Sequence, residues 1–161
     1  MRKNGVRFHD LIASGNVVCG LKPNDSFGAI TELSKRLVQN NAGLDFKKVT
    51  AAVFEREKLF PTVIAPGLAV PHARIEGLDG LLIAIGTSRD GINFNVPMNP
   101  PVKVVILVLT PKDNPGLHLK LLSAIAEDFS DSSLTEKLPL MESPADVIQA
   151  LKDSHKKEIP E

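Results

Sequence analysis

Two nearly continuous runs of β-branched and aliphatic residues, 81–87 and 102–110, constrain the fold of this chain more than any other feature. Such runs form strands that are covered on both faces, because a strand with one solvent-exposed face carries polar side chains at alternate positions. Each face of the resulting sheet then needs a covering layer of helices. We therefore expect an α/β fold with a central sheet and helices on both sides.

Amphipathic helices are predicted before and after these runs. In each of them apolar residues recur every three to four positions, and a capping residue precedes the first turn. The predicted helices cover 26–39 behind Asp25 or Ser26, 46–58 behind Asp45, a segment opened by Asn114-Pro115, and Ser143-Pro144 to about residue 152. Short strands are predicted at 17–21 and 68–70. With no repeat or linker, we expect a single domain, 1–161, with a frayed tail at 154–161.

The composition excludes several classes of function. Lys and Arg number 19 and so do Asp and Glu, a balance that argues against nucleic acid as the main partner. Trp and Tyr are absent, so stacking on bases or sugar rings is not expected. The single Cys19 can form neither an internal disulfide nor a thiolate zinc site, and we expect it to pack in an apolar strand. No signal peptide or membrane span is recognisable, so we expect a cytoplasmic protein without direct membrane insertion.

The segment 67–74, Gly-Leu-Ala-Val-Pro-His-Ala-Arg, carries the first candidate for chemistry. Pro71 cannot donate to a strand ladder, so we expect it to stop the short strand and to place His72 at the mouth of the sheet. Ligands of open α/β sheets gather at strand ends. A neutral imidazole there can act as nucleophile, acid, base or ligand. A purely structural role for His72 is the alternative at this point.

Two further residues are candidates for the same site. His118 falls in the first turns of the helix opened by Asn114-Pro115, on the face of that helix that is expected to point inward. Arg56 occupies a position in the apolar stripe of its helix, and its alternative role is a favourable cation at a helix C-terminus. An inward arginine, two histidines and an amide-rich helix start would together suit a transferable phosphate. His9 and His155 are expected at the surface.

These residues resemble the enzyme IIA components of the fructose–mannitol class of the bacterial phosphoenolpyruvate-dependent phosphotransferase system, together with their nitrogen-regulatory relatives. The resemblance rests on three elements in register and spans essentially the whole chain. They are Glu55-Arg56-Glu57-Lys58-Leu59 with Thr62, the segment 67–74, and Gly116-Leu117-His118-Leu119-Lys120-Leu121-Leu122 with Ile125-Ala126.

The resemblance implies a fold, an activity and partners. The family fold is a single mixed sheet flanked by helices. His72 would accept a phosphoryl group from the phosphohistidine of the small carrier HPr, with His118 as the second active-site histidine and Arg56 steadying the group. Thr62 and Gly67 belong to the same motifs and are expected to support the phosphate site. The next partner would be a IIB domain in the sugar branch, or a regulated transporter or kinase in the nitrogen branch. No metal or organic cofactor is implied.

One departure from the family pattern keeps two alternatives open. The family usually has a glycine-rich stretch before Gly67, with a polar residue next to that glycine, whereas this chain has Pro66 there and β-branched residues before it. Stiffening of this loop favours, as an alternative, a regulatory module that binds partners without being phosphorylated. A metal-binding module using His72, His118 and His9 is a third hypothesis, although the sequence places no carboxylate or thiolate beside them.

Overall fold

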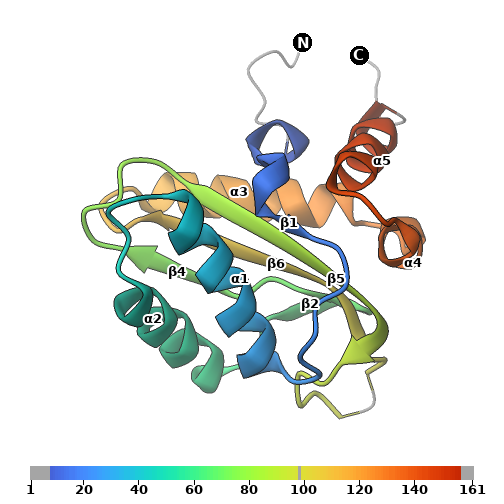
Figure 1. Cartoon of the computed structure of the whole chain (residues 1–161), viewed down its shortest axis with the longest axis horizontal. Coiled ribbons are helices and arrows are strands. Elements are labelled where there is room, and N and C mark those ends of the chain that lie inside the picture. The colour runs from blue at the N-terminus through green and yellow to red at the C-terminus, as the bar shows by residue number, and fades with distance from the viewer. Residues whose placement is uncertain (1–7, 98, 157–161) are drawn as a thin grey trace.

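The computed structural model describes residues 8–97 and 99–156, without the side chains of the last two residues, and shows a single mixed sheet with helices on both sides (Figure 1). The expected α/β class is confirmed. The helices are α1 (Ser26–Asn40), α2 (Phe46–Leu59), α3 (Pro115–Asp128), α4 (Ser133–Lys137) and α5 (Pro144–Lys156), with 3₁₀ turns η1 (Phe8–Leu11), η2 (Ser14–Asn16) and η3 (Leu138–Leu140). The strands are β1 (Val17–Val18), β2 (Val63–Ala65), β3 (Leu68–Ala69), β4 (His72–Ile75), β5 (Leu82–Ile92) and β6 (Val102–Pro111).

The sheet has the order β1-β5-β6-β3-β2, and β4 pairs with β6 beside β3. Strands β5 and β6 form a long antiparallel pair, whereas β1 pairs with β5, and β3 and β4 with β6, in parallel. The two aliphatic runs of the sequence are thus the central strands. They are buried on both faces, as their unbroken apolar pattern predicts.

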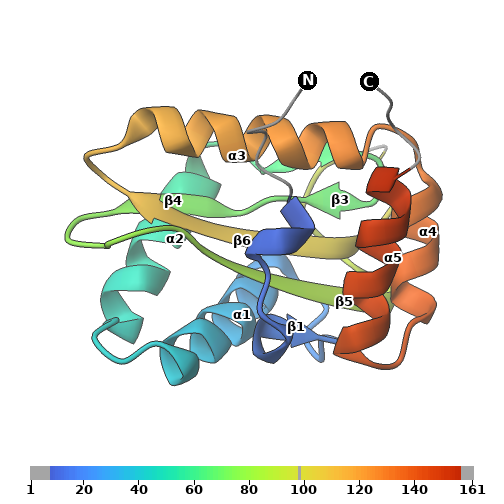
Figure 2. The same cartoon turned by 90° about the horizontal axis from the view of Figure 1, so that it is seen from above.

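Alternating residues of the central strands feed two separate cores. In β6, Val104, Ile106 and Val108 pack with η1, α3 and α5, whereas Val105, Leu107 and Leu109 pack with α1 and α2. Figures 1 and 2 show the corresponding layers, with α1 and α2 on one side of the sheet and α3 and α5 on the other. Because successive side chains of a strand point to opposite faces, each aliphatic run contributes to both helical layers.

The helix ends agree closely with the capping residues. Asp25 accepts from the Gly28 amide, Asp45 from the Lys47 and Lys48 amides, and Asn114 from the Leu117 amide. The last helix also begins as expected, but it continues to residue 156 instead of 152. It therefore includes part of the tail predicted to fray, and 157–161 lie outside the described residues. No helix in the described ranges is long and apolar enough to cross a membrane.

Sequence reasoning missed the short elements β2, β4, α4 and η3. Strand β2 pairs antiparallel with β3 through a tight turn at Pro66-Gly67, where Gly67 has a φ of 82°. Proline followed by a residue with positive φ is the pattern of a type II turn. The unusual Pro66 therefore has a structural role, because it shapes the hairpin that joins β2 to β3.

The short strand β3 ends before Pro71, as expected, but the prediction that His72 then lies at the mouth of the sheet is wrong. The chain resumes as β4 directly after Pro71, and His72 pairs with Val108 well inside β6. Pro71 gives up only its own donor, and its carbonyl still accepts a hydrogen bond from the Val108 amide at 3.0 Å. The interruption separates β3 from β4 and leaves His72 beside a break in the ladder.

Candidate functional site

The tautomer of His72 is fixed by the backbone two residues earlier. Its Nδ1 lies 2.7 Å from the carbonyl oxygen of Val70, which can only accept a hydrogen bond, so Nδ1 carries the proton. The other nitrogen, Nε2, then keeps its lone pair. Burial lowers the pKa of His72 below its ordinary value, and the hydrogen bond to Val70 opposes that effect by stabilising the charged form. Near neutral pH the ring is therefore a neutral imidazole with a free nucleophilic nitrogen.

His118 reaches the same place from helix α3, which covers the face of the sheet toward which His72 points. In β4, Ala73 and Ile75 pack with the α1–α2 core, so His72 and Arg74 face the other layer, which contains α3. The rings of His72 and His118 meet edge to face, with centroids 5.0 Å apart and an interplanar angle of 60°. The expected inward orientation of His118 is thus confirmed, although its side chain is only half-buried.

Thr110, near the end of β6, orients His118. Its fully buried Oγ1 lies 2.7 Å from His118 Nδ1. A hydroxyl that donates to Nδ1 would leave Nε2 of His118 protonated and able to donate to an anion. Sequence reasoning did not identify Thr110 as a site residue. It comes close to the site only because β4 pairs in parallel with β6, with Arg74 opposite Thr110.

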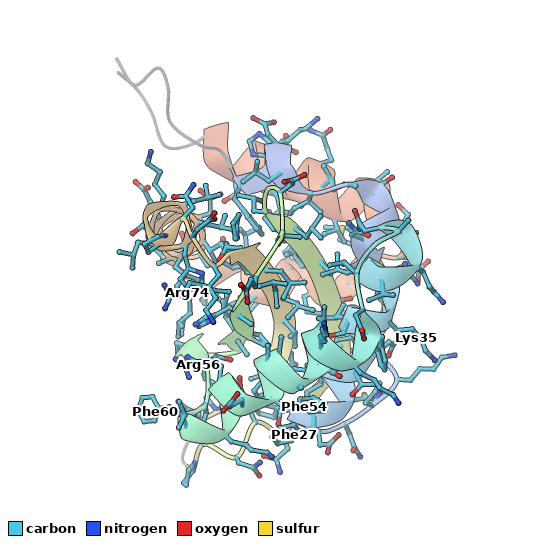
Figure 3. All side chains as sticks on the ribbon, turned by 90° about the vertical axis from the view of Figure 1, so that its left-hand side faces the viewer. Phe27, Lys35, Phe54, Arg56, Phe60 and Arg74 are labelled. Atoms are coloured by element: carbon cyan, nitrogen blue, oxygen red, sulfur yellow. The ribbon has the colours of Figure 1, made fainter. Side chains whose placement is uncertain are left out.

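Two arginines add positive charge around the histidines. Arg56, at the end of α2, donates from Nη1 to the carbonyl oxygen of Phe60 at 3.0 Å, so it has the helix-terminal role that its position allows. It also lies close enough to lower the pKa of both histidines. Arg74 extends from β4 on the same side of the molecule, as Figure 3 shows. Burial, then His72, Arg74 and Arg56, lower the pKa of His118 to about 4.

A buried carboxylate supports the backbone next to His72. Glu57 Oε2 accepts from the Thr62 amide at 3.0 Å, and Glu57 Oε1 accepts from the Thr62 hydroxyl at 2.7 Å. The Thr62 carbonyl in turn accepts from the Val70 amide at 2.9 Å. Thr62 therefore touches the backbone that holds His72. Sequence reasoning did not single out Glu57, although its position four residues after Val53 continues the buried stripe of α2 and was the available signal.

Gly67, expected to support a phosphate, is placed elsewhere. Its carbonyl accepts from the amides of Lys103 and Val104, whereas His72 pairs with Val108. Four residues along β6 correspond to about 13 Å. The structure thus brings together His72, His118, Arg56 and the Thr62 backbone, and Gly67 lies at a turn remote from them.

His9 and Cys19 belong to other parts of the fold, at η1 and just after β1. The expectation of a surface position is wrong for His9, which is 8% exposed in η1, with Nε2 3.3 Å from an Asp10 carboxylate oxygen. The side chain of His155 lies outside the described residues. Cys19 is half-buried just after β1, where burial and then Asp146 raise the pKa of its thiol. Within the ranges 8–97 and 99–156 the structure groups no three His, Cys, Asp or Glu side chains suited to a metal ion.

A mixed sheet covered by helices, with two histidines in contact at its edge beside an arginine, is the arrangement to be compared with known protein families. Residues 10–154 match the family described as phosphoenolpyruvate-dependent sugar phosphotransferase system, EIIA 2, and the chain belongs to it. It is therefore a component of that phosphotransferase system, with a phosphotransfer role.

Among its relatives, a nitrogen regulatory protein of Bradyrhizobium diazoefficiens is 30% identical over 129 residues, which are 80% of this chain and 84% of that protein. The crystal structure of the nitrogen regulatory protein IIA-Ntr from Neisseria meningitidis superposes with a TM-score of 0.80 and 27% identity, over 89% of this chain and 97% of that one. A similar fold, at 20% identity and a TM-score of 0.73, occurs in the complex of enzyme IIA-mannitol and phosphorylated enzyme IIB-mannitol from Escherichia coli. It covers 88% of this chain and 97% of that one.

Proposed function

We propose that this protein is a phosphoryl carrier that accepts a phosphoryl group on His72 from the phosphohistidine of an HPr-type carrier. The observation that carries the proposal is the hydrogen bond from His72 Nδ1 to the Val70 carbonyl, which leaves Nε2 as the free nucleophile. Membership of the EIIA 2 family supports the phosphotransfer role. The site as proposed consists of His72, His118 and Arg56, in a single cytoplasmic domain.

The transfer step is a displacement at phosphorus. The Nε2 lone pair of His72 attacks the phosphorus of the donor phosphohistidine, and the donor nitrogen–phosphorus bond breaks with its electron pair returning to the donor ring. The ring of His72 then bears Nε2–P and Nδ1–H and carries a positive charge. Because the Val70 carbonyl accepts from Nδ1–H, it stabilises that charge as it develops.

The neighbouring cationic and polar groups have separate roles in this step. Arg56 supplies a permanent positive charge toward the oxygens of the group in transfer. His118, held by Thr110, donates from Nε2 to one of those oxygens, and its low pKa keeps it neutral before the phosphoryl group arrives. The first turn of α3, where His118 lies, adds the positive end of a helix dipole.

The phosphoryl group has two proposed outputs. One is transfer to a IIB partner, as in sugar uptake, which the fold shared with the mannitol IIA–IIB complex supports. The other is a regulatory signal read by a transporter or kinase, which the similarity to nitrogen regulatory proteins supports. Incubation of the phosphorylated protein with a cognate IIB separates them, since only the first output removes the phosphate from His72.

The intact mass of the protein after incubation with phosphorylated HPr tests the proposal. We expect one added phosphoryl group that is labile to acid and stable to base, and no addition in His72→Ala. His118→Ala should still be labelled, at a lower rate, because it keeps the nucleophile. Absence of labelling by any cognate HPr, or equal labelling of His72→Ala, contradicts the proposal.

A binding-only regulatory module is the second candidate. It is favoured by exposed apolar side chains in and beside the altered loop, with Leu59, Phe60 and Ile64 at 77%, 68% and 49% exposure. Phe60 projects outward in Figure 3, near Arg56. Such side chains suit a protein partner whether or not His72 is modified. In this case partner affinity would be unchanged in His72→Asp, whereas a phosphorylation-dependent partner would respond to it.

A further inference from the structure

Glu57 is a buried acidic residue close enough to His72 to act on its charge, and it lies in an unfavourable place for a carboxylate. It is 6% exposed, and it lies in the last turn of α2, where the helix dipole repels negative charge. A buried carboxylate needs compensating partners. In the part of the chain that the structure describes, the ion pairs are His9–Asp10 and Arg89–Glu142, so Glu57 is compensated by other means.

Among the described residues, the hydrogen bonds to the Glu57 carboxylate come from Thr62. Both donors of Thr62, the amide and the hydroxyl, point to the Glu57 carboxylate, at 3.0 and 2.7 Å. Thr62 is itself 3% exposed. Charge-assisted bonds of this kind are stronger than neutral ones, so they fix the course of the loop after α2.

The fixed loop continues into the backbone that holds His72. The Thr62 carbonyl accepts from the Val70 amide at 2.9 Å, and the Val70 carbonyl accepts from His72 Nδ1 at 2.7 Å. Val70 is 1% exposed, so water has little access to either of its polar groups. A displacement of Thr62 would therefore move the acceptor that sets the tautomer of His72.

We propose that Glu57 is a positioning residue for the phosphoryl acceptor, acting through Thr62 and Val70 to hold His72 with Nδ1 protonated and Nε2 available. This inference rests on the proposed function. Glu57 does not touch the reacting atoms, and its effect is transmitted by three hydrogen-bonded contacts in sequence. Its charge has a second effect on the ring. Arg56 and Glu57 from α2 act on the charge of His72, His118 from α3 contacts its ring, and Arg74 from its own strand acts on His118; Glu57 is the acidic member of this group.

The tautomer of His72 is measured directly in protein labelled with ¹⁵N-histidine, from the long-range proton–nitrogen couplings of its ring, without any phosphoryl donor. We expect the wild type to show the Nδ1–H form. Glu57→Ala and Thr62→Val, which remove opposite ends of the same contact, should both increase the Nε2–H form. Thr62→Ser, which keeps the hydroxyl, should show the same His72 tautomer as the wild type.

Charge and geometry are separated by Glu57→Gln. A glutamine can accept from the Thr62 amide and donate to its hydroxyl, so the tautomer should be retained while the pKa of His72 falls, because the negative charge is gone. Glu55→Gln removes the same charge from an exposed position of the same helix and is the matched control. It should change neither the tautomer nor the pKa of His72.

Transfer rates from phosphorylated HPr give the functional arm of the test. Misplacement of a nucleophile slows transfer by on the order of tenfold to a hundredfold, so that loss is expected in Glu57→Ala and Thr62→Val. Circular dichroism and thermal unfolding of each variant identify those that remain folded. An unchanged His72 tautomer in folded Glu57→Ala and Thr62→Val overturns the positioning role. Failure of the wild type to accept phosphate instead overturns the proposed function and leaves the tautomer measurement valid.

Discussion

The imidazole rings of His72 and His118 meet edge to face, 5.0 Å between centroids, although one belongs to strand β4 and the other to helix α3. Each ring is anchored through Nδ1, His72 by the Val70 carbonyl and His118 by the Thr110 hydroxyl. Protonation of either ring would place positive charge beside the other and beside Arg56. Both rings are therefore held neutral, and neither of these two hydrogen bonds uses the Nε2 atom of its ring.

Acid should destabilise the protein through His118. Its pKa falls from 6.5 to about 4 on folding, so between these values the unfolded state binds more protons and the free energy of unfolding decreases as the pH falls. A single group contributes at most about 1.4 kcal/mol per pH unit, and the half-exposed position of His118 keeps its share below that limit.

Urea unfolding at several pH values between 4 and 6.5 measures this slope, with His118→Asn as the variant that cannot titrate. The wild type should lose more stability than the variant over that range. Parallel curves for the two proteins would show that protonation of His118 is not penalised by folding.

Replacement of Arg56 by alanine should slow phosphorylation of His72 by roughly a hundredfold, the usual effect of removing one preorganised charge from a transfer site. Arg56→Lys should recover only part of the rate, because an ammonium lacks the planar fork of the guanidinium. Rapid-quench measurement of phosphate on the protein provides the rate. Lys58→Gln, an exposed cation on the same helix, is the control, and an equal loss in that variant would indicate a general charge effect.

Thr110→Val should release His118 while leaving the sheet intact, since the two side chains have nearly the same shape. Loss of one hydrogen bond predicts a decrease of about 1 kcal/mol in the free energy of unfolding. The nitrogen resonances of His118 should move toward a mixture of tautomers, while those of His72 stay in place. A His118 spectrum identical to that of the wild type would argue against the orienting role of Thr110.

Gly67→Ala should affect stability and leave transfer unchanged. The φ of 82° is unfavourable for any residue with a Cβ, so we expect a loss of about 1 kcal/mol, without a steric clash because the nearest atom to the new Cβ is 3.6 Å away. Thermal unfolding and the labelling rate with phosphorylated HPr check the two parts. A strong decrease in the labelling rate of the folded variant would show that Gly67 does support the phosphate site.

The helix starts and the central strands were predictable because their signals are local. Asp25, Asp45 and Asn114 each accept from amides within three residues, so the sequence alone contains both partners of the cap. Strands β2 and β4 were not predictable in this way. Each is short and carries a weak pattern of its own: β2 is one arm of a tight hairpin with β3, and β4 exists because β6, distant in sequence, supplies its hydrogen bonds.

The sequence by itself determined the α/β layers, the two central strands and the identity of His72, His118 and Arg56 as candidates, since periodicity and motif spacing are properties of the chain. Only the tertiary structure decided that His72 begins β4 and pairs with Val108 within β6, that Thr110 holds His118, and that Glu57 is buried against Thr62. These relationships depend on the register between β4 and β6 and on the packing of α2 against β4. Register is set by the whole sheet and its two cores, so no single segment encodes it.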